Sequence, residues 1–176
     1  MKNASKFTIG TIIIGIGVAL ISCFSFIKLI VLQPETTLMV NPPTNIQNVD
    51  SRLIRTNDDD IINLSFNNQI VKATIARSPE KTEKGLMNVT ELNADEGMLF
   101  VFDGLKPRTF WMKDTLISLD IIYLDQNLRV VNMYDNTAPN QTTVVYSSQL
   151  PSSYVLEVNG GTAKRLGLTI GDYFSI

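Results

Sequence analysis

The chain has 176 residues, of which 44% are hydrophobic and 18% are charged, and this is enough for one globular domain with an appended segment. Its net charge of −2 and its pI of about 5.1 give no electrostatic case for a nucleic-acid partner. Histidine is absent and the only cysteine is Cys23, so the chain cannot form a Ser-His or Cys-His nucleophile pair. Zinc would have only carboxylates as ligands in the domain, so we expect no metal site of that kind and no cofactor.

The N-terminal segment predicts a transmembrane helix. Residues 8–27 contain no charged residue, and about twenty apolar residues are what a helix needs to cross a bilayer. Lys2 and Lys6 precede this run without an acidic neighbour, so the positive-inside rule places the N-terminus in the cytoplasm. We therefore predict that residues 1–32 form a cytoplasmic N-terminus and membrane anchor, with the rest of the chain on the exported side, periplasmic or extracellular.

Two other interpretations of the anchor stay open. A cleaved signal peptide fits less well, because the apolar run is longer than the usual signal core of about 7 to 15 residues. Cys23 follows Leu20, Ile21 and Ser22 and so resembles the lipidated cysteine of a bacterial lipobox, although apolar residues continue beyond it. Because Cys23 is the only cysteine, the exported part cannot contain a disulfide and depends on its core.

Residues 33–60 predict a flexible tether. This segment contains Pro34, Pro42 and Pro43, many Asn and Thr residues and three successive aspartates, but no sustained apolar period. We predict that the globular domain occupies residues 61–176.

The first part of the domain predicts a strand followed by a short helix. Residues 69–76 alternate as a strand. Ser78 then offers an N-cap hydroxyl, Pro79 suits the first helical position, and Gly85 can end the helix after about two turns.

The most apolar part of the domain predicts a hairpin. Residues 98–102 are apolar without interruption, which is typical of a strand that is buried on both faces. A turn over residues 103–107 leads to a second strand over residues 109–113, and we expect these two strands to pair antiparallel.

The alternation of the second strand assigns its side chains to two faces. Phe110 and Met112 share one face, and Trp111 and Lys113 share the other. An exposed Trp111 beside a cation and the long loop over residues 136–151 would make a stacking platform for a sugar or a peptide. The alternative is that Trp111 is a core or rim residue whose N–H meets a backbone carbonyl.

Two carboxylates occur on later strands. Asp120 projects from a largely apolar face of the strand over residues 117–124, and Glu157 lies on the strand over residues 155–158. A second short helix is predicted over residues 160–166. The whole pattern, with about seven strands and two short helices, predicts an α+β class with a small antiparallel, barrel-like β domain.

Five motifs in this region resemble, in order, those of the domain of unknown function 192 family. They are GLM at residues 85–87, GMLFVF at 97–102, FWMKDT at 110–115, LDIIYLD at 119–125 and VLEVNGGTAKRLGLTIGD at 155–172. The resemblance covers roughly residues 68–176 and implies an exported or membrane-tethered β-rich domain without a settled activity. Family members commonly have Asn where this chain has Asp114, so no role transfers simply to that position.

The polar residues of these motifs suggest a site. Our leading hypothesis is a non-catalytic module that binds an unknown small ligand or a protein through Trp111, Lys113, Arg108 and Asp120. The alternative for the ionisable residues is a structural ion pair in which Lys113 satisfies a half-buried Asp120 or Glu157.

Two further functions remain as alternatives. A hydrolase or transferase could use Asp120 and Glu157 as acid and base, with Lys113 or Arg108 stabilising negative charge, provided that the carboxyls lie within about 10 Å of each other. Copper(I) could bind at least three converging thioethers, although methionines usually fill gaps in a core. The candidate methionines are Met87, Met98, Met112 and Met133.

Overall fold

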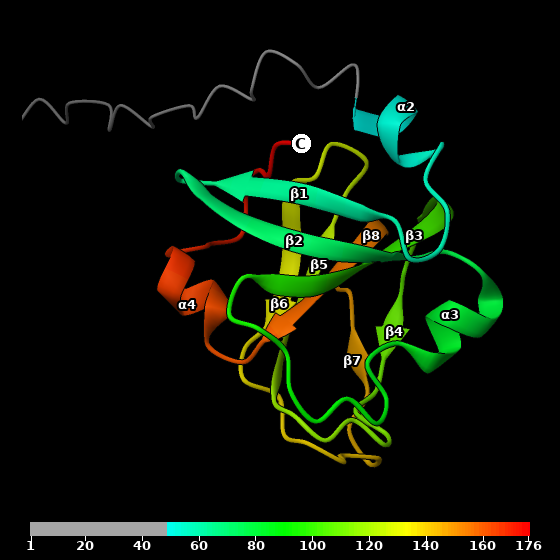
Figure 1. Cartoon of the computed structure of the whole chain (residues 1–176), viewed down its shortest axis with the longest axis vertical. Helices are drawn as coiled ribbons and strands as arrows, with labels where there is room; N and C mark the ends of the chain where they lie inside the picture. Colours follow the sequence, from blue (N-terminus) through cyan, green and yellow to red (C-terminus); the bar gives the residue numbers. More distant parts are fainter. Residues whose placement is uncertain (1–48) are drawn as a thin grey trace, which may run out of the picture. The chain divides into compact units, whose positions relative to one another are not determined.

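In the computed structural model of this protein, the structure describes residues 49–176 (Figure 1). The predicted anchor over residues 1–32, Cys23 and most of the predicted tether lie outside the described residues. Across residues 49–176, no helix combines the length and the apolar character that a membrane crossing requires.

A six-stranded sheet forms the framework of the domain, in the order β1-β2-β3-β8-β5-β6 (Figure 1). Its strands are β1 (Ile61–Phe66), β2 (Gln69–Ala76), β3 (Glu96–Lys106), β5 (Leu119–Leu124), β6 (Val130–Tyr134) and β8 (Ser152–Asn159). Neighbouring strands are antiparallel except for β2 and β3, which run parallel. Because parallel strands need a crossover, the chain between them has room for α3 (Pro79–Lys84).

The expected hairpin between residues 98–102 and 109–113 is wrong. β3 already has β2 on one side and β8 on the other, so it offers no free edge to the chain that follows it. β4 (Thr109–Phe110) pairs instead with β7 (Tyr146–Ser147), a short strand inside the segment that we expected to be an irregular loop.

The sheet is open, so the expected barrel-like closure is also wrong. β1 and β6 are its edges, and no ladder joins them among the described residues. The C-terminal segment forms isolated bridges, Ser175 with Ser65 of β1 and Tyr173 with Arg129 just before β6. The structure confirms a small, mostly antiparallel β-rich domain, but the described residues contain three short helices instead of two.

An apolar cluster lies on each face of the sheet. Leu156 and Val158 of β8 belong to one cluster, which also includes residues of α4 (Thr162–Leu166). Val155 belongs to the other, which includes Phe100 and Tyr123. Because successive strand residues point to opposite faces, the central strands are buried on both sides, as their continuous apolar sequences indicate.

Part of the predicted tether packs on the domain. α2 (Val49–Leu53) ends with Leu53, which is fully buried in the first of these clusters. The Arg77 guanidinium donates a hydrogen bond to the Leu53 carbonyl at 2.9 Å. The folded domain therefore begins before residue 61.

Candidate ligand-binding pocket

A pocket of about 330 Å³ lies between α3, β3 and β4. Figure 1 shows α3 beside β4, at the side of the sheet away from α4. Its apolar lining consists mainly of aromatic side chains, Phe100 and Phe102 from β3 and Phe110 and Trp111 from the β4 region. Phe100 and Phe110 meet edge to face, with ring centroids 4.8 Å apart.

Glu157 is the buried ionisable side chain of this pocket. Only 4% of the residue is exposed, yet it forms part of the lining. Among residues 49–176, the Glu157 carboxyl has no hydrogen-bond or ion-pair partner. Burial raises the pKa of this carboxyl from 4.5 to about 8, so it is largely protonated at pH 7.

The register of β8 explains why Glu157 is desolvated. Glu157 pairs with Met98 of β3 and with Ile121 of β5, and both of these residues belong to the second apolar cluster. Directly opposed residues of antiparallel strands share a face of the sheet. The Glu157 side chain therefore projects into an apolar layer, where its direct neighbours Met98 and Ile121 offer no group that can pair with a carboxylate.

Gly85 ends α3 and forms the pocket wall above Glu157. Its φ of +48° lies in the region that favours glycine, and its N–H donates to the Lys81 carbonyl at 2.8 Å. A Cβ at this position would lie 3.2 Å from Phe100 Cζ and 3.8 Å from Glu157 Oε2. Gly85 therefore packs closely on the Phe100 ring beside the Glu157 carboxyl, and a side chain at this position would crowd the ring.

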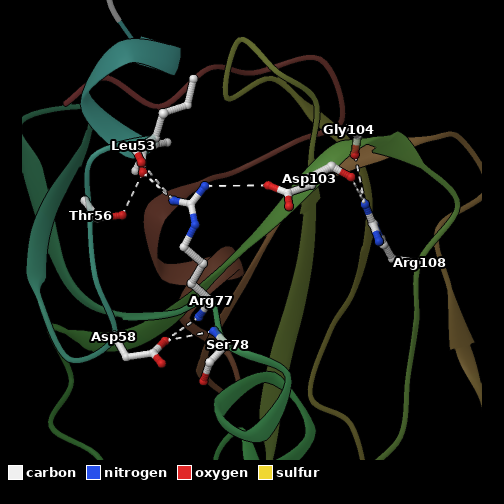
Figure 2. Close-up of polar contacts among 9 residues, drawn as sticks. Leu53, Thr56, Asp58, Arg77, Ser78, Asp103, Gly104 and Arg108 are labelled. Atoms are coloured by element: carbon white, nitrogen blue, oxygen red, sulfur yellow. Dashed lines mark hydrogen bonds and ion pairs between the residues drawn. The ribbon is translucent and has the colours of Figure 1, made fainter.

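A polar network fixes the start of α3 beside the pocket (Figure 2). The Asp58 carboxylate accepts hydrogen bonds from the N–H groups of Arg77 at 2.6 Å and Ser78 at 3.1 Å. Hydrogen bonding by Ser78 and by the Arg77 N–H lowers the pKa of Asp58. The Arg77 guanidinium also lies 3.7 Å from the Asp103 carboxylate, so it links the α2 end to β3.

Asp120 does not face this pocket. Its carboxylate accepts hydrogen bonds from the N–H groups of Asn136 at 2.7 Å, Gly161 at 2.9 Å and Ala163 at 2.7 Å. It thus anchors the first turn of α4, on the face of the sheet opposite Glu157. The structure does not bring the two carboxyls together, and the acid-base pair that the hydrolase alternative requires is absent from it.

Trp111 and Lys113 lie together at the rim of the pocket. Trp111 lines the pocket and is 47% exposed, although it lies just after β4, which ends at Phe110, and not on the strand expected over residues 109–113. The Lys113 Nζ atom lies 5.3 Å from the centroid of the indole and 4.0 Å from the Asp114 carboxylate. The expected structural pair of Lys113 with Asp120 or Glu157 is therefore wrong, because Lys113 makes its contacts at the surface.

Arg108 supports an aromatic wall of the pocket. Its guanidinium carbon lies 4.2 Å from the centroid of the Phe102 ring. It also donates a hydrogen bond to the Gly104 carbonyl at 2.8 Å (Figure 2). Arg108 thus holds a ring of the pocket in place and makes no contact with either Asp120 or Glu157.

The four candidate copper-binding methionines do not form one cluster. Met133 packs on the opposite face of the sheet from Met98 and Met112. The sulfur of Met112 already accepts a hydrogen bond from the Thr137 hydroxyl at 3.2 Å, while Met87 lines the pocket. Among residues 49–176, no group of three His, Cys, Asp or Glu side chains could hold a metal ion either.

Glu157 and Trp111 could be named as candidates from the sequence, but the aromatic wall of the pocket could not. Phe100 and Phe102 were assigned to a strand that is buried on both faces, with no reason to expect a cavity against it. The available signal was the period-two spacing of these phenylalanines, which places them on one face of the strand, together with Gly85, since a glycine lets a helix end pack closely beside an aromatic ring.

The comparisons with known proteins agree with this fold. The model of the domain of unknown function 192 (DUF192) family, described as uncharacterized ACR, matches residues 62–176. A crystal structure of a candidate transcription regulator from Sinorhizobium meliloti 1021 has a TM-score of 0.62 and 30% identity, and the match covers 68% of this chain and 96% of that chain. A protein of unknown function from Novosphingobium aromaticivorans DSM 12444 has a TM-score of 0.62 and 35% identity, over 66% of this chain and 85% of that chain. None of the curated proteins matches. The domain that carries the Glu157 pocket therefore belongs to the uncharacterised DUF192 family.

Proposed function

We propose that this protein is a small-molecule-binding module without catalytic activity, and that its ligand occupies the pocket at Glu157. The proposal rests on Glu157, a residue that is 4% exposed, lines a pocket of about 330 Å³ and has a carboxyl without a partner among the described residues. Buried polar groups are normally hydrogen-bonded, and a perturbed one in a cleft is a functional candidate. A ligand would supply the missing partner.

The surroundings of Glu157 favour binding over acid-base catalysis. Asp120 accepts three backbone hydrogen bonds on the other face of the sheet, so it cannot act as a second carboxyl in the pocket. Seven of the fourteen lining residues are apolar, four of them aromatic, and the polar ones include Glu157 and three threonines, a mixture that suits a small molecule with apolar and polar parts. β3 and β8 of the central sheet also contribute residues to the pocket, and sheet strands hold a binding site more rigidly than loops do.

We further propose that the N-terminal segment holds this module at the membrane, on the exported side. The support is the uncharged run over residues 8–27 and the lysines before it. The description of the Sinorhizobium protein as a candidate regulator belongs to that protein, and a net charge of −2 gives no electrostatic support for DNA binding here.

The binding proposal can be tested with the full-length chain. Trp111 is the only tryptophan and lines the pocket, so its fluorescence reports occupancy. We expect that, in a panel of small amines, alcohols and carboxylates, at least one class changes the Trp111 emission and raises the melting temperature. Thr109→Phe, which adds bulk at the pocket lining, should abolish both effects, whereas Thr142→Phe in the exposed loop should not. A panel without any binder would overturn the proposal.

A further inference from the structure

We infer that the ligand of this pocket is an organic ammonium ion with a short apolar body, an inference that rests on the proposed binding function. The first reason is charge. Glu157 is buried in the lining without a cation, and the one lysine of the lining, Lys84, is exposed. An ammonium group would bring the counter-charge that the ionised carboxyl needs and that the described residues do not supply, in a place where low polarity strengthens the attraction.

The second reason is the geometry around Gly85. Phe100 Cζ and Glu157 Oε2 lie 3.2 Å and 3.8 Å from the same point, the position that a Gly85 Cβ would occupy. The Phe100 ring and the Glu157 carboxyl therefore lie side by side in the lining, and a cationic group bound in the pocket beside Gly85 can contact both. Both contacts attract a cation, the carboxylate through its charge and the ring through its quadrupole.

The third reason is that other rings of the pocket already accept cations on their faces. The Arg108 guanidinium lies 4.2 Å from the Phe102 centroid, and the Lys113 ammonium lies 5.3 Å from the Trp111 centroid. Both distances are within the range of cation–π contacts, about 6 Å. The aromatic lining therefore suits a cationic ligand as well as its apolar body.

Other classes of ligand fit less well. An anion would meet Glu157 without a buried cation to hold it, because Lys84 is at the exposed rim. A purely apolar ligand would cover the carboxyl and leave it unpaired, which costs free energy. An ammonium ion avoids both penalties.

Binding of a cation requires the ionised form of Glu157, so the carboxyl would release its proton to solvent. The other ionisable side chains around it are Tyr123 from β5 and Glu83 and Lys84 from α3. The Tyr123 hydroxyl donates to the Tyr146 carbonyl, and burial raises its pKa. Because burial raises the pKa of Glu157 to about 8, affinity for a cation should rise with pH until the carboxyl is ionised.

The test uses three probes with a short alkyl body but different charge on the full-length chain: butyltrimethylammonium, butanol and butyrate. The charge of the quaternary ammonium does not change with pH, so a pH dependence reports the protein. We expect its affinity to increase about tenfold per pH unit between pH 6 and pH 8 and then to level off. At pH 9 it should bind at least about tenfold more tightly than butanol or butyrate. Calorimetry and Trp111 fluorescence provide the dissociation constants.

The Glu157→Gln variant keeps the shape of the side chain and removes its charge. We expect it to lose both the preference for the cation and the pH dependence, while its affinity for butanol stays within about twofold of the wild type. The Glu80→Gln variant, on α3 but outside the lining, should behave as the wild type.

If butanol binds as tightly as the cation, or butyrate binds more tightly, the ammonium inference is overturned while the binding function stands. If none of the three probes binds, the ammonium inference is overturned as well, and the broader panel decides the binding function separately.

Discussion

At the scale of single residues, the two buried carboxyls of this domain differ because of what surrounds them. Asp120 accepts hydrogen bonds from three backbone N–H groups, whereas Glu157 faces apolar side chains and a pocket. The sequence placed both on apolar strands, but it could not tell them apart. The groups that pair with Asp120 come from residues 136, 161 and 163, and only the folded chain brings them to β5.

Glu157 should make the stability of the protein depend on pH. The folded state keeps the proton up to a pKa of about 8, while the unfolded chain releases it near 4.5. The folded state therefore binds more protons in this window, and its free energy of unfolding falls as pH rises from 4.5 to 8, by roughly 4 kcal/mol. Glu157→Gln removes this dependence, so the variant should match the wild type near pH 4.5 and exceed it at pH 8.

Urea unfolding of both proteins at pH 4.5, 6 and 8 measures this difference directly. Because other groups titrate equally in the two proteins, only the difference between them counts. A constant difference across the three pH values would show that the carboxyl keeps its ordinary pKa.

Asp120 should matter for stability and not for ligand binding. Asp120→Ala leaves three backbone N–H groups without their acceptor, which we expect to lower the free energy of unfolding by at least about 3 kcal/mol. Asp135→Ala, at an exposed carboxyl directly after β6, should change the free energy of unfolding by less than about 0.5 kcal/mol. Denaturant unfolding at pH 7 distinguishes the two, and equal costs would contradict a structural role for Asp120.

At the scale of elements, local signals in the sequence were more reliable than the pairing of strands. The helix predicted after Ser78 is confirmed. It could be predicted because its N-cap serine, its first-turn proline and its terminal glycine lie within a few residues of one another. The hairpin was wrong because the choice of partner for β3 depends on β2 and β8. β8 follows β3 by about fifty residues, so the sequence near residues 98–102 does not indicate that β8 is the partner of β3.

The helix α2 provides a test of where the folded domain begins. Leu53 is fully buried in an apolar cluster, and Ile54 beside it is 59% exposed. We expect Leu53→Ala to lower the free energy of unfolding by about 2 to 4 kcal/mol, because it leaves a cavity in the core. Ile54→Ala removes a similar side chain and should cost less than about 0.5 kcal/mol. If Leu53→Ala were as mild as Ile54→Ala, α2 would not belong to the cooperative unit.

At the scale of the whole molecule, the family and the β-rich class could be predicted, but the closure of the sheet could not. Motifs and alternation show that strands form and that their faces are apolar. Whether the outer strands meet depends on how they diverge in space, and the C-terminal segment bridges both edges here, at Ser65 and at Arg129. An edge that is covered in this way is protected from pairing with other chains, and no closed barrel is needed.

The placement of the module at a membrane is the remaining expectation for the whole chain. A retained helix over residues 8–27 should keep the full-length protein in membranes that have been washed with carbonate, and protease added on the exported side should reach the domain. A chain without residues 1–32 should leave the membrane fraction. Cys23→Ser distinguishes the two kinds of anchor, because it leaves a spanning helix intact but removes the site of a lipid. Retention of this variant supports the helix, its release would support lipidation, and a wild-type protein in the soluble fraction would contradict both.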